Sequence, residues 1–259
     1  MRNCRGLSPM DFRSSLNCEG FCVVPRAFDA AGLESLVAAV SPLRERHASD
    51  SVRHREGSVY AARNALELCP TLIELWREPQ LIYLVLETLG ERAGLVRGLF
   101  FDKPPGQTWA LPWHKDLTIT VRDNRAVPRY SKPRLRAGVW HCEPPLEVLE
   151  AMLTLRIHLD DVTGENGPLE VLPGSHLTGK ELRIERFEPR RILVNAGDVF
   201  VMRPLLAHCS GRSTPGTTRH RRVLHLEFAA MAQLPGGHEW HEFHSVVRRD
   251  GSCAFSDDG

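Results

Sequence analysis

The chain has 259 residues, 42% of them hydrophobic and 25% charged, and a formal net charge of +1 at pH 7. This is the composition of a globular protein with a sizeable core, and the charge argues against a nucleic-acid-binding protein, which needs a basic stripe. No apolar run is long enough to span a membrane, and no secretory signal peptide opens the sequence. The seven cysteines lack the paired spacing of a zinc site. We therefore expect a cytoplasmic protein with reduced thiols and with neither nucleic acid nor membrane as a partner.

The first third of the chain is predicted to be mainly helical. An apolar, strand-like run, Phe21–Val24, opens it and ends at a proline. Asp29 is a suitable N-cap for a first helix, and Gly90 is a suitable C-cap for helical spacing that begins at Thr71. The polar stretch from about 45 to 57, rich in arginine and histidine, predicts a loop between these helices.

After residue 94 the apolar pattern changes to that of short strands separated by glycine and proline turns, which is typical of a β-sandwich or barrel. The strand candidates are 95–101, 118–121, 153–159, 169–171, 191–194, 199–202 and 222–228. The long, basic stretch 123–145 is predicted to be a loop over the mouth of the barrel, because loops of that length are commonly functional. Its basic residues have two open interpretations, contact with an anionic substrate or simple solvation. In or beside the stretch these are Arg122, Arg125, Arg129, Lys132, Arg134 and Arg136.

Helical segments first and strands second predict a β core with helices packed outside it. We therefore expect a fold that is mainly β with flanking helices (α+β), in a single domain that spans 1–259. Its helical part covers about 1–92, the β core about 93–230, and a C-terminal extension 231–259. The last residues, 252–259, are expected to be disordered.

The pattern with the most chemical content is His114-Lys-Asp116, followed far downstream by His208. Side chains at i and i+2 of an extended segment point to the same face, so His114 and Asp116 can hold one ion together. His208 lies at the far end of the strand candidate 199–202 and supplies a third ligand from elsewhere in the fold. Two imidazoles and one carboxylate leave coordination positions open, which suits ferrous iron that must also bind a cosubstrate and oxygen.

A strand that opens with arginine follows the second histidine. A buried arginine at Arg221 is suited to clamp a carboxylate through two parallel, charge-assisted hydrogen bonds. Ser210, two residues after His208, faces the same way and can share that carboxylate. Arg219 competes with Arg221 for the role, but strand alternation favours Arg221, because it shares a face with His225.

Four motifs in order resemble the phytanoyl-CoA dioxygenase family: W-H-K-D at 113–116, N-G-P-L-E-V-L-P-G-S-H at 166–176, H-C-S-G at 208–211, and R-R-V-L-H-L-E-F at 221–228. The resemblance covers roughly residues 18 to 230 and implies a double-stranded β-helix (jelly-roll) core. It also implies iron(II), 2-oxoglutarate and O2 as cofactors and cosubstrates. On this resemblance His114, Asp116 and His208 are the iron ligands, and they carry the catalysis. Arg221 is then the residue that binds the distal carboxylate of 2-oxoglutarate, with Ser210 as its hydroxyl partner.

Other residues have weaker claims on the site. Arg156 and His158 share one strand face with Thr154 and Asp160, so this polar face either lines the active-site cavity or meets water. Arg156 is the best candidate on it for contact with cosubstrate or substrate. His176, in a loop, is not expected to be a ligand. Arg63 and Asn64 have two open roles, at the mouth of the site or in a surface helix. Lys103 and Trp109 are candidates for the pocket wall, and Trp109 is equally suited to packing. Lys115 stands where many members of the family carry glutamine, which leaves any contact from it to the cosubstrate open.

The resemblance implies a dioxygenase that hydroxylates a small molecule and releases succinate and carbon dioxide. Related halogenases replace the carboxylate ligand by a small residue, so Asp116 favours hydroxylation. Two alternatives remain: a non-catalytic jelly-roll protein that binds a small molecule, and a metal-dependent cupin-type enzyme that does not use 2-oxoglutarate. The sequence identifies neither the substrate nor the oligomeric state, for which a monomer is the working expectation.

Overall fold

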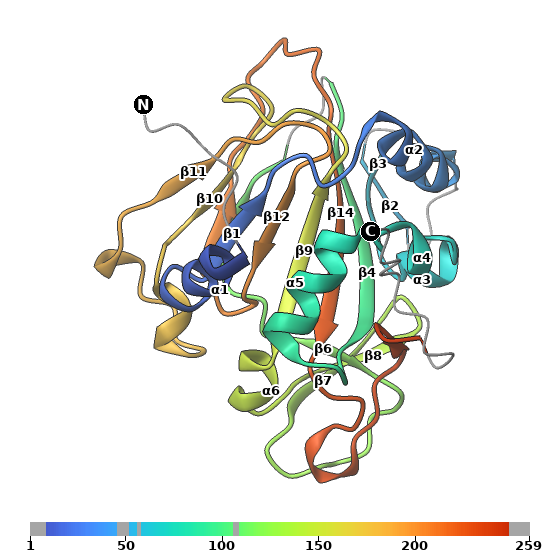
Figure 1. The fold of residues 1–259 in the computed structure, drawn as a ribbon, viewed down its shortest axis with the longest axis vertical. Helices are drawn as coiled ribbons and strands as arrows, with labels where there is room; N and C mark the ends of the chain where they lie inside the picture. Colours follow the sequence, from blue (N-terminus) through green and yellow to red (C-terminus); the bar gives the residue numbers. More distant parts are fainter. Residues whose placement is uncertain (1–8, 46–51, 56–57, 106–108, 249–259) are drawn as a thin grey trace, which may run out of the picture.

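Two antiparallel sheets stacked face to face form the core of the structure, a computed structural model that describes residues 9–45, 52–55, 58–105 and 109–248 (Figure 1). The major sheet contains, in spatial order, β1 (Phe21–Val24), β12 (Val199–Met202), β9 (Met152–His158), β14 (Arg221–Ala229), β4 (Gly94–Lys103), β3 (Ser58–Ala62) and β2 (Val52–Arg55), and β15 (His244–Ser245) also pairs with β4. The minor sheet contains β11 (Arg190–Ile192), β10 (Leu169–Val171), β13 (His208–Ser210) and β5 (Leu111–His114). The mainly β fold with flanking helices is as predicted.

A third sheet of three strands lies at one end of the molecule (Figure 1). It contains β6 (Ile119–Val121), β8 (Val139–Glu143) and β7 (Ser131–Arg136). The prediction of a loop over 123–145 was therefore wrong for 131–136 and 139–143, where β7 and β8 pair as an antiparallel hairpin, whereas 123–130 form neither helix nor strand. All six residues of β7 are exposed and one is a proline, so this edge strand has no apolar alternation by which a sequence could reveal it.

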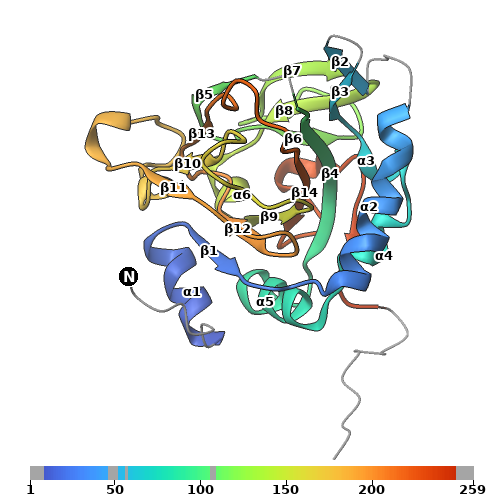
Figure 2. The same ribbon diagram turned by 90° about the horizontal axis from the view of Figure 1, so that it is seen from above.

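The helices lie mostly outside the major sheet, where α2 and α5 run along its outer face (Figure 2). The helices are α1 (Pro9–Cys18), α2 (Ala30–Glu45), α3 (Ala65–Leu68), α4 (Leu72–Leu75), α5 (Pro79–Leu89) and α6 (Leu146–Glu150), with 3-10 turns η1 (Ser175–Thr178), η2 (Ile184–Arg186) and η3 (Pro235–Gly237). The capping predictions are confirmed. Asp29 precedes α2, and its Oδ1 accepts a hydrogen bond of 2.8 Å from the N–H of Gly32 in the first turn. Gly90 follows α5 with a positive φ of 85°.

Strand alternation gives the major sheet two different faces. On β14, Leu224, Leu226 and Phe228 point outward into the apolar cluster that the helices complete. The Phe228 ring meets Trp76 edge-on at 4.7 Å between centroids. The intervening residues, among them Arg221, point inward between the two sheets. This inner face positions the candidate site.

Most predicted strands exist within a residue or two of their expected bounds, and two details differ. The loop predicted for 45–57 was wrong for 52–55, which form β2 at the sheet edge; the rest of that stretch apart from Glu45 lies outside the described residues. His208 does not end the strand of 199–202 but opens a new strand, β13, in the opposite sheet. The predicted C-terminal tail, 252–259, lies outside the described residues.

Four of the described cysteines are free thiols: Cys18, Cys22, Cys142 and Cys209. Among the described ranges, no helix combines the length and the apolar character needed to cross a membrane.

Candidate metal centre and cosubstrate pocket

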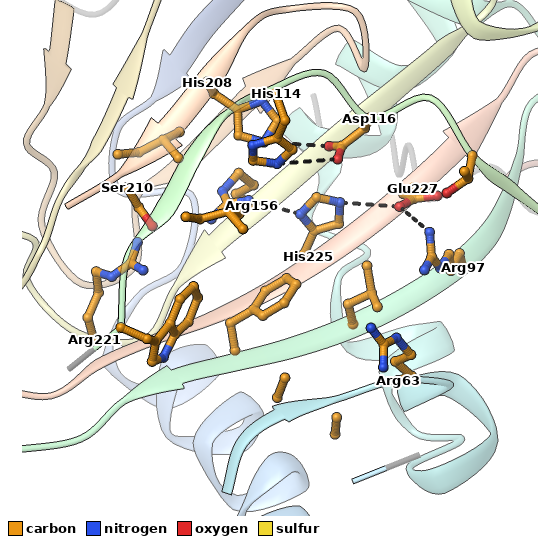
Figure 3. A pocket seen from close by; sticks show the side chains of 18 of the residues that line it. Arg63, Arg97, His114, Asp116, Arg156, His208, Ser210, Arg221, His225 and Glu227 are labelled. Carbon is orange, nitrogen blue, oxygen red and sulfur yellow. Dashed lines mark hydrogen bonds and ion pairs between the residues drawn. The ribbon is translucent and has the colours of Figure 1, made fainter. Parts of the chain in front are cut away.

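The three predicted metal ligands converge between the two sheets. His114 ends β5 and His208 begins β13, and the two residues lie opposite each other in the antiparallel register. Asp116 follows two residues later, held by its backbone N–H, which donates to Pro204 O over 3.0 Å. His114 Nε2 lies 3.9 Å from Asp116 Oδ1, and His208 Nε2 lies 3.7 Å from Asp116 Oδ2 (Figure 3). One ligand atom from each residue fits within a mutual distance of 4.8 Å.

Both imidazoles are held in the tautomer that a metal requires. His114 Nδ1 lies 2.8 Å from Pro112 O, and His208 Nδ1 lies 2.9 Å from Leu206 O. A carbonyl oxygen only accepts hydrogen bonds, so each Nδ1 donates and each Nε2 is left with a free lone pair. Burial lowers the pKa of His208 to about 4, which keeps this ring neutral at physiological pH. Both Nε2 atoms face Asp116.

The carboxylate of Asp116 is suited to a cation. Burial by itself raises its pKa, but the neighbouring imidazoles, above all His208, and the guanidinium of Arg156 outweigh this and keep the pKa below its ordinary value. Asp116 Oδ2 is buried and has no hydrogen-bond partner among the described residues. A buried, ionised oxygen without a partner is costly unless a ligand satisfies it. Two imidazole lone pairs and this oxygen therefore form a donor set that fits a divalent metal such as iron(II).

A cavity of about 270 Å³ adjoins the cluster, and its floor is the inner face of β4, β9 and β14. Arg221 lines this cavity and is 2% exposed. Its Nε and Nη1 have no hydrogen-bond partner among the described residues. Burial, followed by the nearby charge of Arg156, lowers the pKa of Arg221 to about 9. A guanidinium with two unpaired donors aimed into a cavity is suited to an anion.

Arg219 lies outside the cavity. Its side chain is 52% exposed, and its Nε lies 3.7 Å from Glu165 Oε2 at the surface. Of the two arginines that the sequence left in competition, only Arg221 lines the pocket.

Ser210 lines the cavity beside Arg221 (Figure 3). A buried lysine, Lys103, stands behind it and donates from Nζ to Ser210 Oγ over 3.2 Å. The same Nζ donates to Gly211 O at 2.5 Å and lies 4.5 Å from the ring centre of Trp109. Burial, followed by the positive charges of Arg221 and Arg156, lowers the pKa of Lys103 to about 6. Lys103 therefore fixes Ser210 from behind, while Trp109 lines the pocket itself.

The polar face of β9 is buried and does not meet bulk water. Arg156 lines the cavity, and its Nη1 donates to His225 Nδ1 over 3.0 Å, while its Nε has no partner among the described residues. Burial lowers the pKa of Arg156 to about 10 and that of His158 well below its ordinary value. Asp160, at the end of the face, instead holds Arg222 through a bidentate ion pair.

Three other residues discussed from the sequence point elsewhere. His176 Nε2 lies 3.1 Å from Asn17 O, away from the metal cluster. Lys115 Nζ donates to Ser175 O and Gly179 O, so it fastens the turn after β10 and is not among the residues that line the pocket. Asn64 donates to Ala137 O, whereas Arg63 lines the cavity.

The sequence reasoning missed a chain of polar groups at the other end of the cavity. Arg97 Nη1 lies 3.1 Å from Glu227 Oε1, and His225 Nε2 lies 3.4 Å from the same oxygen (Figure 3). Strand alternation could have identified Glu227, because it lies an even number of residues from Arg221 on β14 and so points to the same face. Arg97 likewise interrupts the otherwise apolar run of residues 95–101.

Fold and cluster together define a jelly-roll protein with a site of two histidines and one carboxylate. The family model described as Phytanoyl-CoA dioxygenase (PhyH) matches residues 16–221, and the chain belongs to this family. The chain is 32% identical to an L-proline trans-4-hydroxylase of Streptomyces griseoviridis over 113 residues, which cover 44% of this chain and 33% of that protein. The alignment thus spans about a third of the hydroxylase.

Solved structures of jelly-roll oxygenases share the fold. EctD from S. alaskensis, solved with 2-oxoglutarate and 5-hydroxyectoine, matches with a TM-score of 0.67 at 18% identity, over 92% of this chain and 82% of that chain. The non-heme alpha ketoglutarate dependent epimerase SnoN from nogalamycin biosynthesis matches with a TM-score of 0.65 at 19% identity, over 94% and 96% of the two chains. At these identities the likeness establishes the jelly-roll fold, as predicted.

Proposed function

We propose that the protein is an iron(II)- and 2-oxoglutarate-dependent dioxygenase that hydroxylates a small molecule and releases succinate and carbon dioxide. One observation carries the proposal. The cluster of His114, Asp116 and His208 shares a single cavity with Arg221, whose buried guanidinium has unpaired donors. A metal-chelating ligand with an anionic far end satisfies both groups at once.

Each residue then has a defined task. His114, Asp116 and His208 hold iron(II), which when bound supplies the oxidising chemistry with O2 and 2-oxoglutarate. Arg221 binds the distal carboxylate of 2-oxoglutarate, and Ser210, held by Lys103, hydrogen-bonds to the same group. Arg156 faces the metal side of the cavity, where it adds positive charge near the rest of the cosubstrate.

Membership of the family supports this assignment, as do two of the similar proteins. The relative from Streptomyces griseoviridis is named for hydroxylation of L-proline, and EctD has been solved with 2-oxoglutarate. L-Proline is therefore a reasonable first substrate to test, but the fold also occurs in an epimerase. Asp116, as a third ligand, favours hydroxylation among the reactions open to this fold.

The test is succinate formation from 2-oxoglutarate by the purified protein with iron(II) and O2, with L-proline and a panel of other small molecules as candidate substrates. Asp116→Ala is expected to lower turnover by about 10³-fold or more, since a metal ligand is lost. Glu170→Ala, which changes a partly exposed carboxylate on the minor sheet, is the matched control. Binding of cobalt(II), followed by its visible absorption, reports on the metal site independently of activity.

The same experiment separates the alternatives. Retained metal binding with no succinate under any condition would indicate a non-catalytic binding protein. Substrate turnover that needs metal but not 2-oxoglutarate, and that Arg221→Ala leaves intact, would indicate a cupin-type enzyme of another kind.

A further inference from the structure

We propose that the end of the cavity remote from Arg221 binds an anionic group of the substrate, and that this group is a carboxylate. The inference rests on the proposed function, because that function assigns the Arg221 end of the cavity to the cosubstrate.

The cavity has two distinct ends along β14. Arg221 and Glu227 share the inner face and are six residues apart, which in a strand corresponds to roughly 20 Å. They pair across the sheet with Lys103 and Arg97 of β4. The metal cluster lies between these ends, with Arg221 to one side and the Arg97–Glu227 pair to the other (Figure 3). A dicarboxylate that chelates the metal and reaches Arg221 occupies one end and leaves the other for the substrate.

The substrate end carries an excess of positive charge. Three arginines line it from three separate parts of the chain: Arg63 after β3, Arg97 on β4 and Arg136 on β7. Among the described residues that line this end, Glu227 is the carboxylate; it is bonded to Arg97, and Arg136 forms no ion pair with any of them. A cleft lined by charges of one sign concentrates ligands of the opposite sign.

Arg97 is pre-organised for recognition. Its Nη1 is held by Glu227, and its Nη2 donates to His141 Nε2 over 3.2 Å. His141 Nδ1 in turn donates to Val139 O, and burial, with the charge of Arg97, lowers the pKa of His141 to about 4. A neutral imidazole and a carboxylate therefore fix the guanidinium plane before any ligand arrives, which lowers the entropic cost of binding.

Among the basic residues in or beside 123–145, Arg136 is the candidate for contact with an anionic substrate. Four of its basic neighbours form ion pairs at the surface; they are Arg122, Arg125, Arg129 and Lys132. Arg136 forms no ion pair within the described part of the chain, and of the six basic residues it is the one that lines the cavity. The hairpin thus contributes one arginine to the pocket and otherwise solvates its charges.

The size of the cavity favours a carboxylate over a bulkier oxyanion. About 270 Å³ is below the range of roughly 300–1,000 Å³ usual for ligand pockets. It must hold the cosubstrate as well as the reacting part of the substrate. The guanidinium fork binds carboxylate and phosphate alike, so the limited volume is what favours the smaller, planar carboxylate over the larger, tetrahedral phosphate.

The test is a binding experiment that needs no turnover. The protein is loaded with nickel(II) and 2-oxoglutarate, and calorimetry measures the affinity of matched pairs: benzoate with benzamide, and cyclohexanecarboxylate with its amide, with phenyl phosphate as a third arm. We expect each carboxylate to bind about tenfold more tightly than its amide. Arg136→Gln should bring that ratio close to one, and Arg134→Gln, on the same exposed strand, should leave it unchanged.

Other outcomes overturn the inference. Amides that bind as tightly as carboxylates, absence of any carboxylate binding, a ratio that Arg136→Gln does not alter, or preference for the phosphate would each contradict a carboxylate site. Failure of the proposed function looks different, because 2-oxoglutarate titrated alone would then not bind, or would bind independently of Arg221.

Discussion

The two faces of β9 and β14 are made by alternate residues of the same strands, yet they have opposite chemistry. The outer face carries Leu155, Leu226 and Phe228, which pack against the helices with almost no exposure. The inner face carries Arg156 and Arg221, which are also buried but have donor atoms without a partner in the described part of the chain. Burial therefore stabilises the fold through one face and costs free energy on the other. Buried donors without partners are typical of a place where a ligand binds, so the outer face is the scaffold and the inner face is the candidate site.

Phe228→Ala tests the outer face and has the largest expected effect on stability. The side chain is completely buried and meets Trp76 edge-on, so its loss leaves a cavity under the helices. We expect the free energy of unfolding to fall by about 3–5 kcal/mol, as measured by urea denaturation. A fall below about 1 kcal/mol would show that the outer face is not the main source of stability.

Arg221→Met tests the inner face, with effects of opposite sign on binding and stability. Removing an unpaired buried charge is expected to raise the free energy of unfolding of the ligand-free protein by about 1–4 kcal/mol. The affinity for 2-oxoglutarate should fall roughly 10- to 100-fold, because a charge-assisted hydrogen-bonding group is lost. Denaturation and calorimetry on the same variant measure both quantities.

Arg219→Gln is the matched control, because that side chain is half exposed and paired only at the surface. It should change both quantities by less than about 0.5 kcal/mol. An Arg221→Met variant that is destabilised, or an Arg219→Gln variant that loses 2-oxoglutarate, would break the proposed division between the faces.

Lys103 gives the most specific effect, a dependence of stability on pH. Its pKa is about 6 in the folded protein, lowered from 10.5 by burial and by the nearby arginines. Between these values the unfolded chain binds a proton that the folded protein does not. This group therefore makes the free energy of unfolding increase as the pH rises from about 6 towards 10, by at most about 1.4 kcal/mol per pH unit.

Lys103→Met should flatten that slope, which urea denaturation at a series of pH values measures for both proteins. An identical slope in the two proteins would mean that Lys103 keeps its charge in the fold.

Pattern and order in the sequence predicted the β core and brought the three metal ligands, Arg221 and Ser210 into one hypothesis. Ligand spacing and strand alternation are local properties, and these residues follow them. Strand alternation also places Glu227 on the inner face, but its contact with Arg97 was not predictable, because the two residues lie 130 apart in sequence. The β7–β8 hairpin was not predicted, because β7 is an exposed edge strand that is stabilised by pairing with β8. Its sequence therefore lacks the apolar alternation of a buried strand.

The hydrogen bonds from His114 and His208 to backbone carbonyls two residues earlier have a consequence for substitutions elsewhere in the pocket. In many metal sites a neighbouring side chain sets the tautomer of a histidine ligand, so a substitution there disturbs the metal. Here each histidine is oriented by the backbone carbonyl two residues before it. Substitutions of pocket-wall residues such as Arg63 and Arg136 are therefore expected to leave the orientation of both imidazole rings unchanged.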